Sequence, residues 1–164
     1  MTIFFDANQN HHVLPPNEKI FWRISGYPLV QLKNKILMVV PTWNTMWELP
    51  GGGIELAESI SDGIIRECYE ETGYKIKLLP GAPLYVGEMN FLYTRHHAKK
   101  FFHSLIMVYQ AKITSKKLNV HIINTMDGNE IQKVEWVALN KLNKKNCHPT
   151  VYPAIKLLQK VSRR

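Results

Sequence analysis

The sequence predicts a mixed α/β or α+β sandwich in a single domain. Three observations lead to this fold class. Runs of branched and aromatic residues alternate with polar turns along most of the chain, which is typical of strands. A helical pattern interrupts these runs at residues 59–72, and a second one closes the chain at residues 150–162. Strands that surround one helix and precede another predict a sheet covered by helices.

The length and composition fit one ordinary globular domain. The chain has 164 residues, of which 45% are hydrophobic and 21% are charged. A chain of this length buries a core without disulfides or structural metals. We therefore expect a single domain over residues 1–164, in which the polar residues 1–19, with their two adjacent prolines, form an irregular lead-in.

The charge and the cysteines bear on partners and compartment. The formal net charge of +8 favours anionic partners such as nucleotides or RNA, although many basic proteins bind no anion. The two cysteines, Cys68 and Cys147, cannot form a disulfide framework and suit a reducing cytosol. The chain has neither a signal-peptide pattern nor an apolar run long enough to cross a bilayer. We expect a cytoplasmic protein without membrane contact, as a monomer or a homodimer.

Local patterns place the elements of the first half. Apolar runs at 29–32 and 36–40 flank the turn Lys33-Asn34-Lys35, which predicts a hairpin. Residues 47–53 predict a short strand that runs into glycines. Ser59 is a candidate N-cap for the helix over 59–72, and Gly73 stands where a glycine commonly ends a helix.

The second half predicts a long hairpin, one more strand and a closing helix. Residues 84–93 and 101–113 are rich in aromatic and branched side chains and flank a basic loop. Residues 131–139 predict the last strand. The closing helix tolerates Pro153 in its first turn and has one apolar stripe. That stripe consists of Val151, Ala154, Ile155, Leu158 and Val161.

An acidic cluster on the first helix carries the chemistry. Glu67, Glu70 and Glu71 fall within an arc of roughly 100° on one helix edge. Like charges at this spacing repel, and a divalent cation held by oxygen ligands, Mg²⁺ or Mn²⁺, would offset the repulsion. Arg66 can pair with a neighbouring acid, and the glycines at 51–53 let the backbone approach a metal or a phosphate. Taken separately, these features also suit a solvated acidic helix and an ordinary turn.

Together, these residues resemble a known signature. The stretch from Glu48 to Tyr74, ELPGGGIELAESISDGIIRECYEETGY, resembles the Nudix box of the MutT-like hydrolases over residues 52–74. All seven fixed positions of the box match, and Cys68 and Tyr74 replace its usual aliphatic residues with other apolar types. The fixed positions are Gly52, Glu58, Arg66, Glu67, Glu70, Glu71 and Gly73.

The resemblance implies a fold and an activity. The implied fold is an α/β/α sandwich with a mixed sheet, in which the box forms a loop–helix–loop motif. The implied enzyme is a Nudix hydrolase that uses Mg²⁺ or Mn²⁺ to cleave a phosphoanhydride bond in a nucleoside diphosphate linked to another moiety. The implied metal ligands are Glu67, Glu70, Glu71 and the carbonyl of Gly52, with Glu58 in support and with Glu67, Glu70 and Arg66 also serving in catalysis.

The general base varies within the family. Glu130 stands before the last strand, where members often place a catalytic or metal-binding acid, and Asp127 is the next candidate. If the strand is regular from Glu130, then Glu130 shares a face with Trp136 and faces the box helix. A bulge or a loop would transfer the role to Asp127, and a box glutamate, Glu67 first, is the remaining choice.

The substrate is less defined. Arg95, Lys99 and Lys100 could hold phosphates, or they could be a solvated hairpin tip, and Tyr93 could stack on a base. Three functions remain open. The leading one is a hydrolase of a small nucleotide-like molecule. The second is an RNA 5′-end pyrophosphohydrolase, favoured by the positive charge. The third is a non-catalytic Nudix ligand-binding or regulatory module, although every box carboxylate is present.

Overall fold

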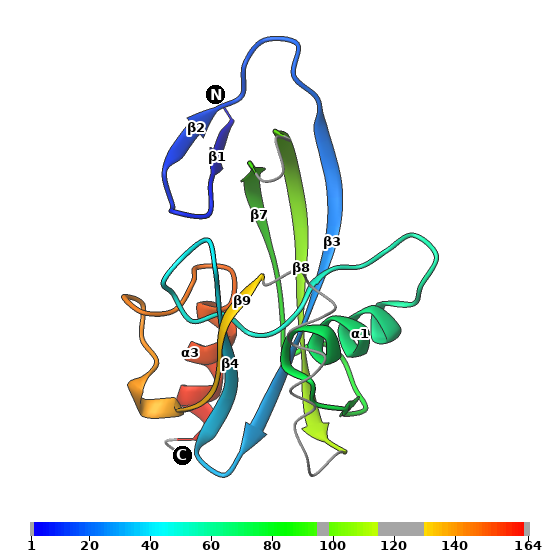
Figure 1. The fold of residues 1–164 in the computed structure, drawn as a ribbon, viewed down its shortest axis with the longest axis vertical. Coiled ribbons are helices and arrows are strands. Elements are labelled where there is room, and N and C mark those ends of the chain that lie inside the picture. The colour runs from blue at the N-terminus through cyan, green and yellow to red at the C-terminus, as the bar shows by residue number, and fades with distance from the viewer. Residues whose placement is uncertain (1, 95–98, 115–129, 163–164) are drawn as a thin grey trace.

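The computed structural model describes residues 2–94, 99–114 and 130–162. Within these ranges one mixed sheet is accompanied by two α-helices, α1 (Ile60–Thr72) and α3 (Tyr152–Val161), which confirms the predicted fold class (Figure 1). Neither helix is long and apolar enough to cross a membrane. The short 3-10 helix η1 (Leu139–Lys141) follows the last strand.

The sheet combines parallel and antiparallel pairs. Its main order is β2-β1-β7-β8-β3-β4-β9, and β5 and β6 pair with β3 and β8. The two longest strands, β3 and β8, run parallel, and most other pairs are antiparallel. The strands are β1 (Ile3–Phe5), β2 (His11–Val13), β3 (Ile20–Leu32), β4 (Lys35–Pro41), β5 (Gly52–Gly53), β6 (Ile76–Leu78), β7 (Tyr85–Tyr93), β8 (Lys100–Ile113) and β9 (Ile131–Ala138).

Alternation along β4 divides the core between the two helices. Ile36 and Met38 are fully buried in a cluster that includes α3, whereas Leu37 is fully buried in a cluster that includes Ile64 and Cys68 of α1. Successive strand residues point to opposite faces, so the two helices cover opposite faces of this part of the sheet. This arrangement is the helix–sheet–helix layering that the sequence predicts.

The predicted hairpins form with small shifts of their ends. β3 and β4 pair around a turn at Lys33-Asn34, and Lys33 adopts a positive φ of 54°. β7 and β8 pair from Tyr85 to Tyr93 as predicted. β3 begins at Ile20, earlier than the apolar run at 29–32 indicates, because its first half pairs along β8.

The caps of α1 are those that the sequence predicts. The Ser59 hydroxyl accepts a hydrogen bond from the backbone N–H of Asp62 at 3.1 Å. Gly73 takes the left-handed conformation, with φ 67°, and its N–H donates to the carbonyl of Tyr69 at 2.8 Å. α3 begins two residues later than expected, at Tyr152, and the last residue of its predicted stripe, Val161, is exposed.

The prediction of one short strand over residues 47–53 is wrong. Only Gly52 and Gly53 form a strand, β5, while Trp47 and Glu48 make isolated bridges to Cys147 and Val39. Pro50 has no N–H to give to a ladder, and Gly51 adopts φ 130°, so a continuous strand cannot pass through them.

The expectation of an irregular segment over residues 1–19 is also wrong. β1 and β2 form an antiparallel hairpin that pairs with β7, at the opposite end of the molecule from the C-terminus (Figure 1). Asp6 holds its turn by accepting hydrogen bonds from the backbone N–H groups of Asn8 and Asn10, each at 2.9 Å. Phe4 is fully buried with its ring 4.9 Å from that of Phe101. Strands of three residues are too short to give an alternating pattern.

We predict that Gly26→Ala destabilises the protein by about 1–3 kcal/mol, the usual cost of overpacking. A Cβ at Gly26 would overlap Cγ1 of Ile64, which is fully buried and cannot move aside. Urea denaturation measures the change. In an Ile64→Ala background the same substitution should cost less, because the overlapping atoms are gone. An equal cost in both backgrounds would contradict this account of how α1 packs on β3.

Candidate active site

A cavity of about 130 Å³ lies over the face of the sheet formed by β3, β8 and β7. Its floor follows the strand register, because Arg23 pairs with Ser104 and Ser104 pairs with Met89 across the three strands. Ser25 and Ile106 form the next row. The floor residues are Arg23, Ser25, Tyr27, Met89, Phe91, Ser104 and Ile106.

Acidic residues and glycines form one side of the cavity. Glu67 and Glu71 of α1 line it beside Gly51 and Gly52, and Glu48 and Glu130 also belong to the lining. The remaining lining residues are Ala7, Val39, Pro41, Trp43, Leu49, Ile131, His148 and Thr150. Glu67 and Glu71 therefore lie beside the glycine loop at the cavity.

Two glycines are needed where the loop meets α1. The N–H of Gly51 donates to Oε2 of Glu71 at 2.7 Å, and the φ of 130° at Gly51 is one that other residues rarely adopt. A Cβ at Gly52 would lie 2.9 Å from Oε2 of Glu67. A side chain at Gly52 would therefore displace Glu67, whereas one at Gly51 would collide with the backbone carbonyl of Gly26.

Arg66 holds the other acids of α1 in place. Its guanidinium donates to Glu58 at 2.7 and 3.0 Å, to Glu67 at 3.1 Å and to Glu70 at 2.9 Å. The hydrogen bonds from Arg66 lower the pKa of Glu58 from 4.5 to about 2. The same interaction with Glu58 raises the pKa of Arg66, so this pair is ionised at neutral pH.

The predicted metal trio is divided between two partners. Glu70 binds Arg66 and is not among the cavity-lining residues, whereas Glu71 faces the cavity. Among the described residues, no three His, Cys, Asp or Glu side chains are gathered as metal ligands. Glu67 and Glu70 thus accept hydrogen bonds from Arg66, and Glu71 accepts one from the N–H of Gly51. The role of these three side chains as metal ligands stays a prediction.

Glu130 lines the cavity, but not for the expected reason. β9 has a bulge at Gln132, because Val40 pairs with Lys133 and Pro41 pairs with Ile131. The regular alternation from Glu130 to Trp136 is therefore wrong, and Ile131 takes the cavity side in place of Gln132. Trp136 does face the core, where its Nε1 donates to the Tyr74 hydroxyl at 3.3 Å. The alternative acid, Asp127, lies outside the described residues.

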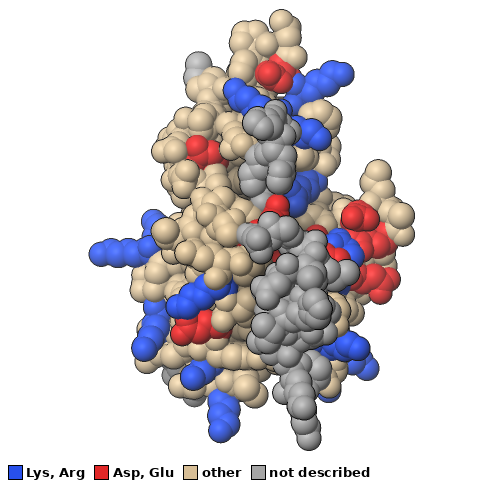
Figure 2. Space-filling view, viewed as in Figure 1, with Lys and Arg blue, Asp and Glu red and all other residues tan. Residues whose placement is uncertain are grey.

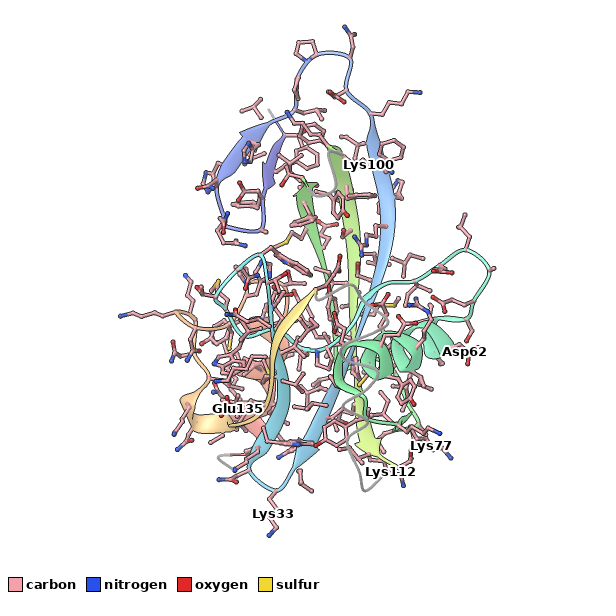
Figure 3. All side chains as sticks on the ribbon, viewed as in Figure 1. Lys33, Asp62, Lys77, Lys100, Lys112 and Glu135 are labelled. Carbon is pink, nitrogen blue, oxygen red and sulfur yellow. The ribbon has the colours of Figure 1, made fainter. Side chains whose placement is uncertain are left out.

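Those residues of the predicted phosphate-binding site that the structure describes do not line the cavity. Lys99 places its ammonium 5.4 Å from the Phe101 ring, and Lys100 pairs with Tyr93 in the ladder. Figure 3 shows Lys100 at the far end of the sheet from α1, where Asp62 is labelled. None of Tyr93, Lys99 and Lys100 lines the cavity, and Arg95 lies outside the described residues.

Comparison with known proteins identifies the family. A model of the NUDIX domain matches residues 23–158. The chain belongs to the NUDIX family. A "MutT-like protein" of Streptomyces ambofaciens is 38% identical to it over 50 residues, which span 30% of this chain and only 32% of that relative.

Solved structures share the fold. A MutT NUDIX hydrolase from Burkholderia pseudomallei has a TM-score of 0.61 and 22% identity, covering 84% of this chain and 98% of its own. An ADP-ribose pyrophosphatase from Streptococcus suis has a TM-score of 0.59 and 15% identity, covering 87% and 92%. The predicted membership among the MutT-like Nudix hydrolases is thereby confirmed.

This Nudix chain carries cavity residues that sequence reasoning missed. Arg23 is a charged residue inside an otherwise apolar and aromatic strand, a signal that could have pointed to it. Glu48 belongs to the lead-in of the box. Burial raises the pKa of Tyr27, and the negative charge of Glu48 raises it further. His148 gave no local signal, because its partners are set by the tertiary fold.

His148 closes the end of the cavity next to the N-terminal hairpin. It is only 4% exposed, and its Nδ1 lies 2.7 Å from the Thr150 hydroxyl. Its Nε2 lies 2.7 Å from the side-chain amide of Gln9, at the tip of that hairpin. Ala7 of the same turn lines the cavity, so the hairpin forms part of the wall.

The cysteines take no part in this site. Cys68 is fully buried on the face of α1 that packs into the core, and burial raises the pKa of its thiol to about 12. Burial likewise raises the pKa of Cys147 to about 11. Both side chains therefore remain neutral thiols near pH 7.

We predict that Glu58→Gln destabilises the protein at pH 7 and that the effect disappears in acid. The pKa of Glu58 is lowered to about 2, so the ion pair with Arg66 contributes fully above the ordinary value of 4.5. Its contribution is lost as the pH falls through about 2. Urea midpoints of both proteins should converge across this range. Glu135→Gln, in the exposed pair with Lys133, is the control; a Glu58→Gln deficit that persists in acid would contradict the assignment.

Proposed function

We propose that the protein hydrolyses a phosphoanhydride bond in a nucleoside diphosphate linked to another moiety, with Mg²⁺ or Mn²⁺. One observation carries the proposal. A single cavity brings the box carboxylates Glu67 and Glu71 together with the glycine loop and with the guanidinium of Arg23. Carboxylates that attract a cation and an arginine that attracts an anion suit a metal-bound diphosphate.

The donor set fits a hard divalent cation. Glu48, Glu67, Glu71 and Glu130 line the cavity, and the functional atoms of their side chains are all oxygens. Oxygen ligands favour Mg²⁺ or Mn²⁺ over softer metals. We propose that Glu67 and Glu71 hold the ion, with Gly52, and that Glu70 joins them when it leaves Arg66. When bound, the ion supplies Lewis-acid activation of water and neutralises charge on the phosphate oxygens.

Residues of the chain bind the phosphates and accept the proton of the attacking water. Arg23 binds the phosphate that does not react and fixes its position. Gly51 and Gly52 leave room for the phosphate oxygens. Glu130 accepts the proton of the attacking water, with Glu67 the next choice. Attack at phosphorus breaks the bond to the bridging oxygen, and the products are two phosphate monoesters and a proton.

The cavity favours a small linked nucleotide. Its volume of about 130 Å³ holds only part of such a molecule, since complete ligand pockets measure roughly 300–1,000 Å³. The second moiety would therefore extend into solvent. The neighbour named as an ADP-ribose pyrophosphatase has this fold and acts on a substrate of this kind by its name.

The alternatives receive less support. Figure 2 shows acidic side chains gathered over the loop that leads into α1, whereas lysines and arginines are dispersed over the rest of that face. RNA binding commonly uses a continuous basic surface, so we propose a small molecule in preference to an RNA 5′ end. A non-catalytic module is disfavoured by the complete box. We keep the proposal of a cytoplasmic protein on the basis of its two unpaired, buried cysteines.

We predict strict dependence on a divalent cation. Exhaustive EDTA treatment should abolish hydrolysis of nucleoside diphosphate derivatives, and added Mg²⁺ should restore it. Glu71→Gln and Glu70→Gln should each lower kcat by at least about a hundredfold, the scale for losing a key electrostatic group. Circular dichroism checks that the fold is intact, and Glu135→Gln is the matched exposed control. Activity that survives EDTA, or near-normal turnover in both variants, would refute the metal assignment.

We predict that Glu130→Gln lowers kcat, because an amide cannot accept the proton of the attacking water. The measurement is kcat from pH 5 to 9 for wild type, Glu130→Gln and Asp127→Asn. Full activity in Glu130→Gln together with loss in Asp127→Asn would assign the base to Asp127. Full activity in both would assign it to a box glutamate.

A further inference from the structure

Two buried hydroxyl groups in the cavity floor have no partner within the described part of the chain. Ser25 is 3% exposed and Ser104 is 6% exposed, and both line the cavity. Neither hydroxyl makes a hydrogen bond to a described residue. Buried polar groups are normally paired, and an unpaired one at a cavity wall points to a ligand or an ordered water.

The two serines adjoin the proposed phosphate site. Ser104 pairs directly with Arg23 across the β3–β8 ladder, and Ser25 is two residues from Arg23 on the same face of β3. A group bound by both serines would therefore be attached close to the phosphate that Arg23 holds. The part of a nucleotide that lies next to its phosphates is the nucleoside.

The surrounding side chains favour a flat ring. Trp43 and Phe91 are half-buried and line the same cavity, where each can take the face of a planar heterocycle. The edge of such a ring carries hydrogen-bond donors and acceptors. A serine hydroxyl can serve as either donor or acceptor, so the pair can match such an edge.

His148, in the end wall of the cavity, has no ring nitrogen left to bind such an edge. Both ring nitrogens of His148 are already engaged, one by Gln9 and one by the Thr150 hydroxyl. His148 therefore shapes the wall without offering a free nitrogen. The hydroxyls of Ser25 and Ser104, which make no hydrogen bond to a described residue, remain available in the floor beside it.

We propose that Ser25 and Ser104 recognise the edge of the nucleobase and thereby determine which nucleoside the enzyme accepts. The proposal rests on the proposed function and deepens it, because it assigns the non-reacting part of the substrate to a place in the cavity. It predicts that base recognition is separable from metal binding, which occurs on the acidic side.

The test measures binding without metal or turnover. Isothermal titration calorimetry in EDTA compares the four common nucleoside 5′-monophosphates with ribose 5-phosphate, which lacks a base. Wild type should bind at least one nucleotide more tightly than ribose 5-phosphate. Ser25→Ala and Ser104→Ala should each weaken the binding of that nucleotide by about three- to tenfold, the scale of one hydrogen bond. The affinity for ribose 5-phosphate should not change. Ser61→Ala, exposed at the start of α1, is the matched control.

A stability measurement separates binding from a structural role. Removing an unpaired buried hydroxyl should leave the thermal midpoint unchanged or raise it, whereas removing a structural hydrogen bond would lower it. The proposal is overturned if wild type shows no preference for a base. It is also overturned if both variants bind the nucleotide normally, or weaken nucleotide and ribose 5-phosphate alike.

The proposed function is tested separately. Wild type that binds a nucleotide through the serines but hydrolyses no nucleoside diphosphate derivative, with Mg²⁺ present, would refute the hydrolase proposal and leave the base site standing. Hydrolysis by wild type together with unchanged base binding in both variants would refute the base site and leave the hydrolase proposal standing.

Discussion

Arg66 makes the acidic edge of α1 possible. Four carboxylates stand within reach of one another at the start and along one edge of this helix, and their mutual repulsion would otherwise weaken it. By binding Glu58, Glu67 and Glu70 at once, the guanidinium converts this repulsion into a connected network. Glu71 is held separately by the N–H of Gly51. The two arrangements fix the box helix against the glycine loop, and the position of the cavity follows from this contact.

Empty space in the sheet is the second condition for a site. Strands in a buried sheet normally carry large apolar residues, yet the floor of the cavity has Ser25 and Ser104 at its centre, and Gly51 and Gly52 at its side. Larger residues stand beside them in the floor, including Tyr27, Met89 and Ile106. The hydrophobic clusters on the two faces of β4 thus provide rigidity, while the small residues of β3 and β8 provide room.

The sequence predicts what depends on local spacing and misses what depends on distant pairing. The caps at Ser59 and Gly73, the box on one helix edge and the two long hairpins all follow from residues close together in the chain. The bulge at Gln132 arises from pairing with β4, and it leaves no pattern in β9 alone. Arg23 was overlooked in an apolar strand, and the basic loop attracted the phosphate prediction because charge was the visible signal. The N-terminal hairpin was missed because its strands are three residues long.

The contact between Gln9 and His148 joins residues separated by 139 positions, nearly the whole length of the chain. On a ribosome the hairpin that carries Gln9 is therefore made 139 residues before His148. Domains generally fold as units during synthesis, and contacts at such a separation close late. The nascent protein therefore has an incomplete cavity wall until the segment that carries His148 has been made and has reached the hairpin.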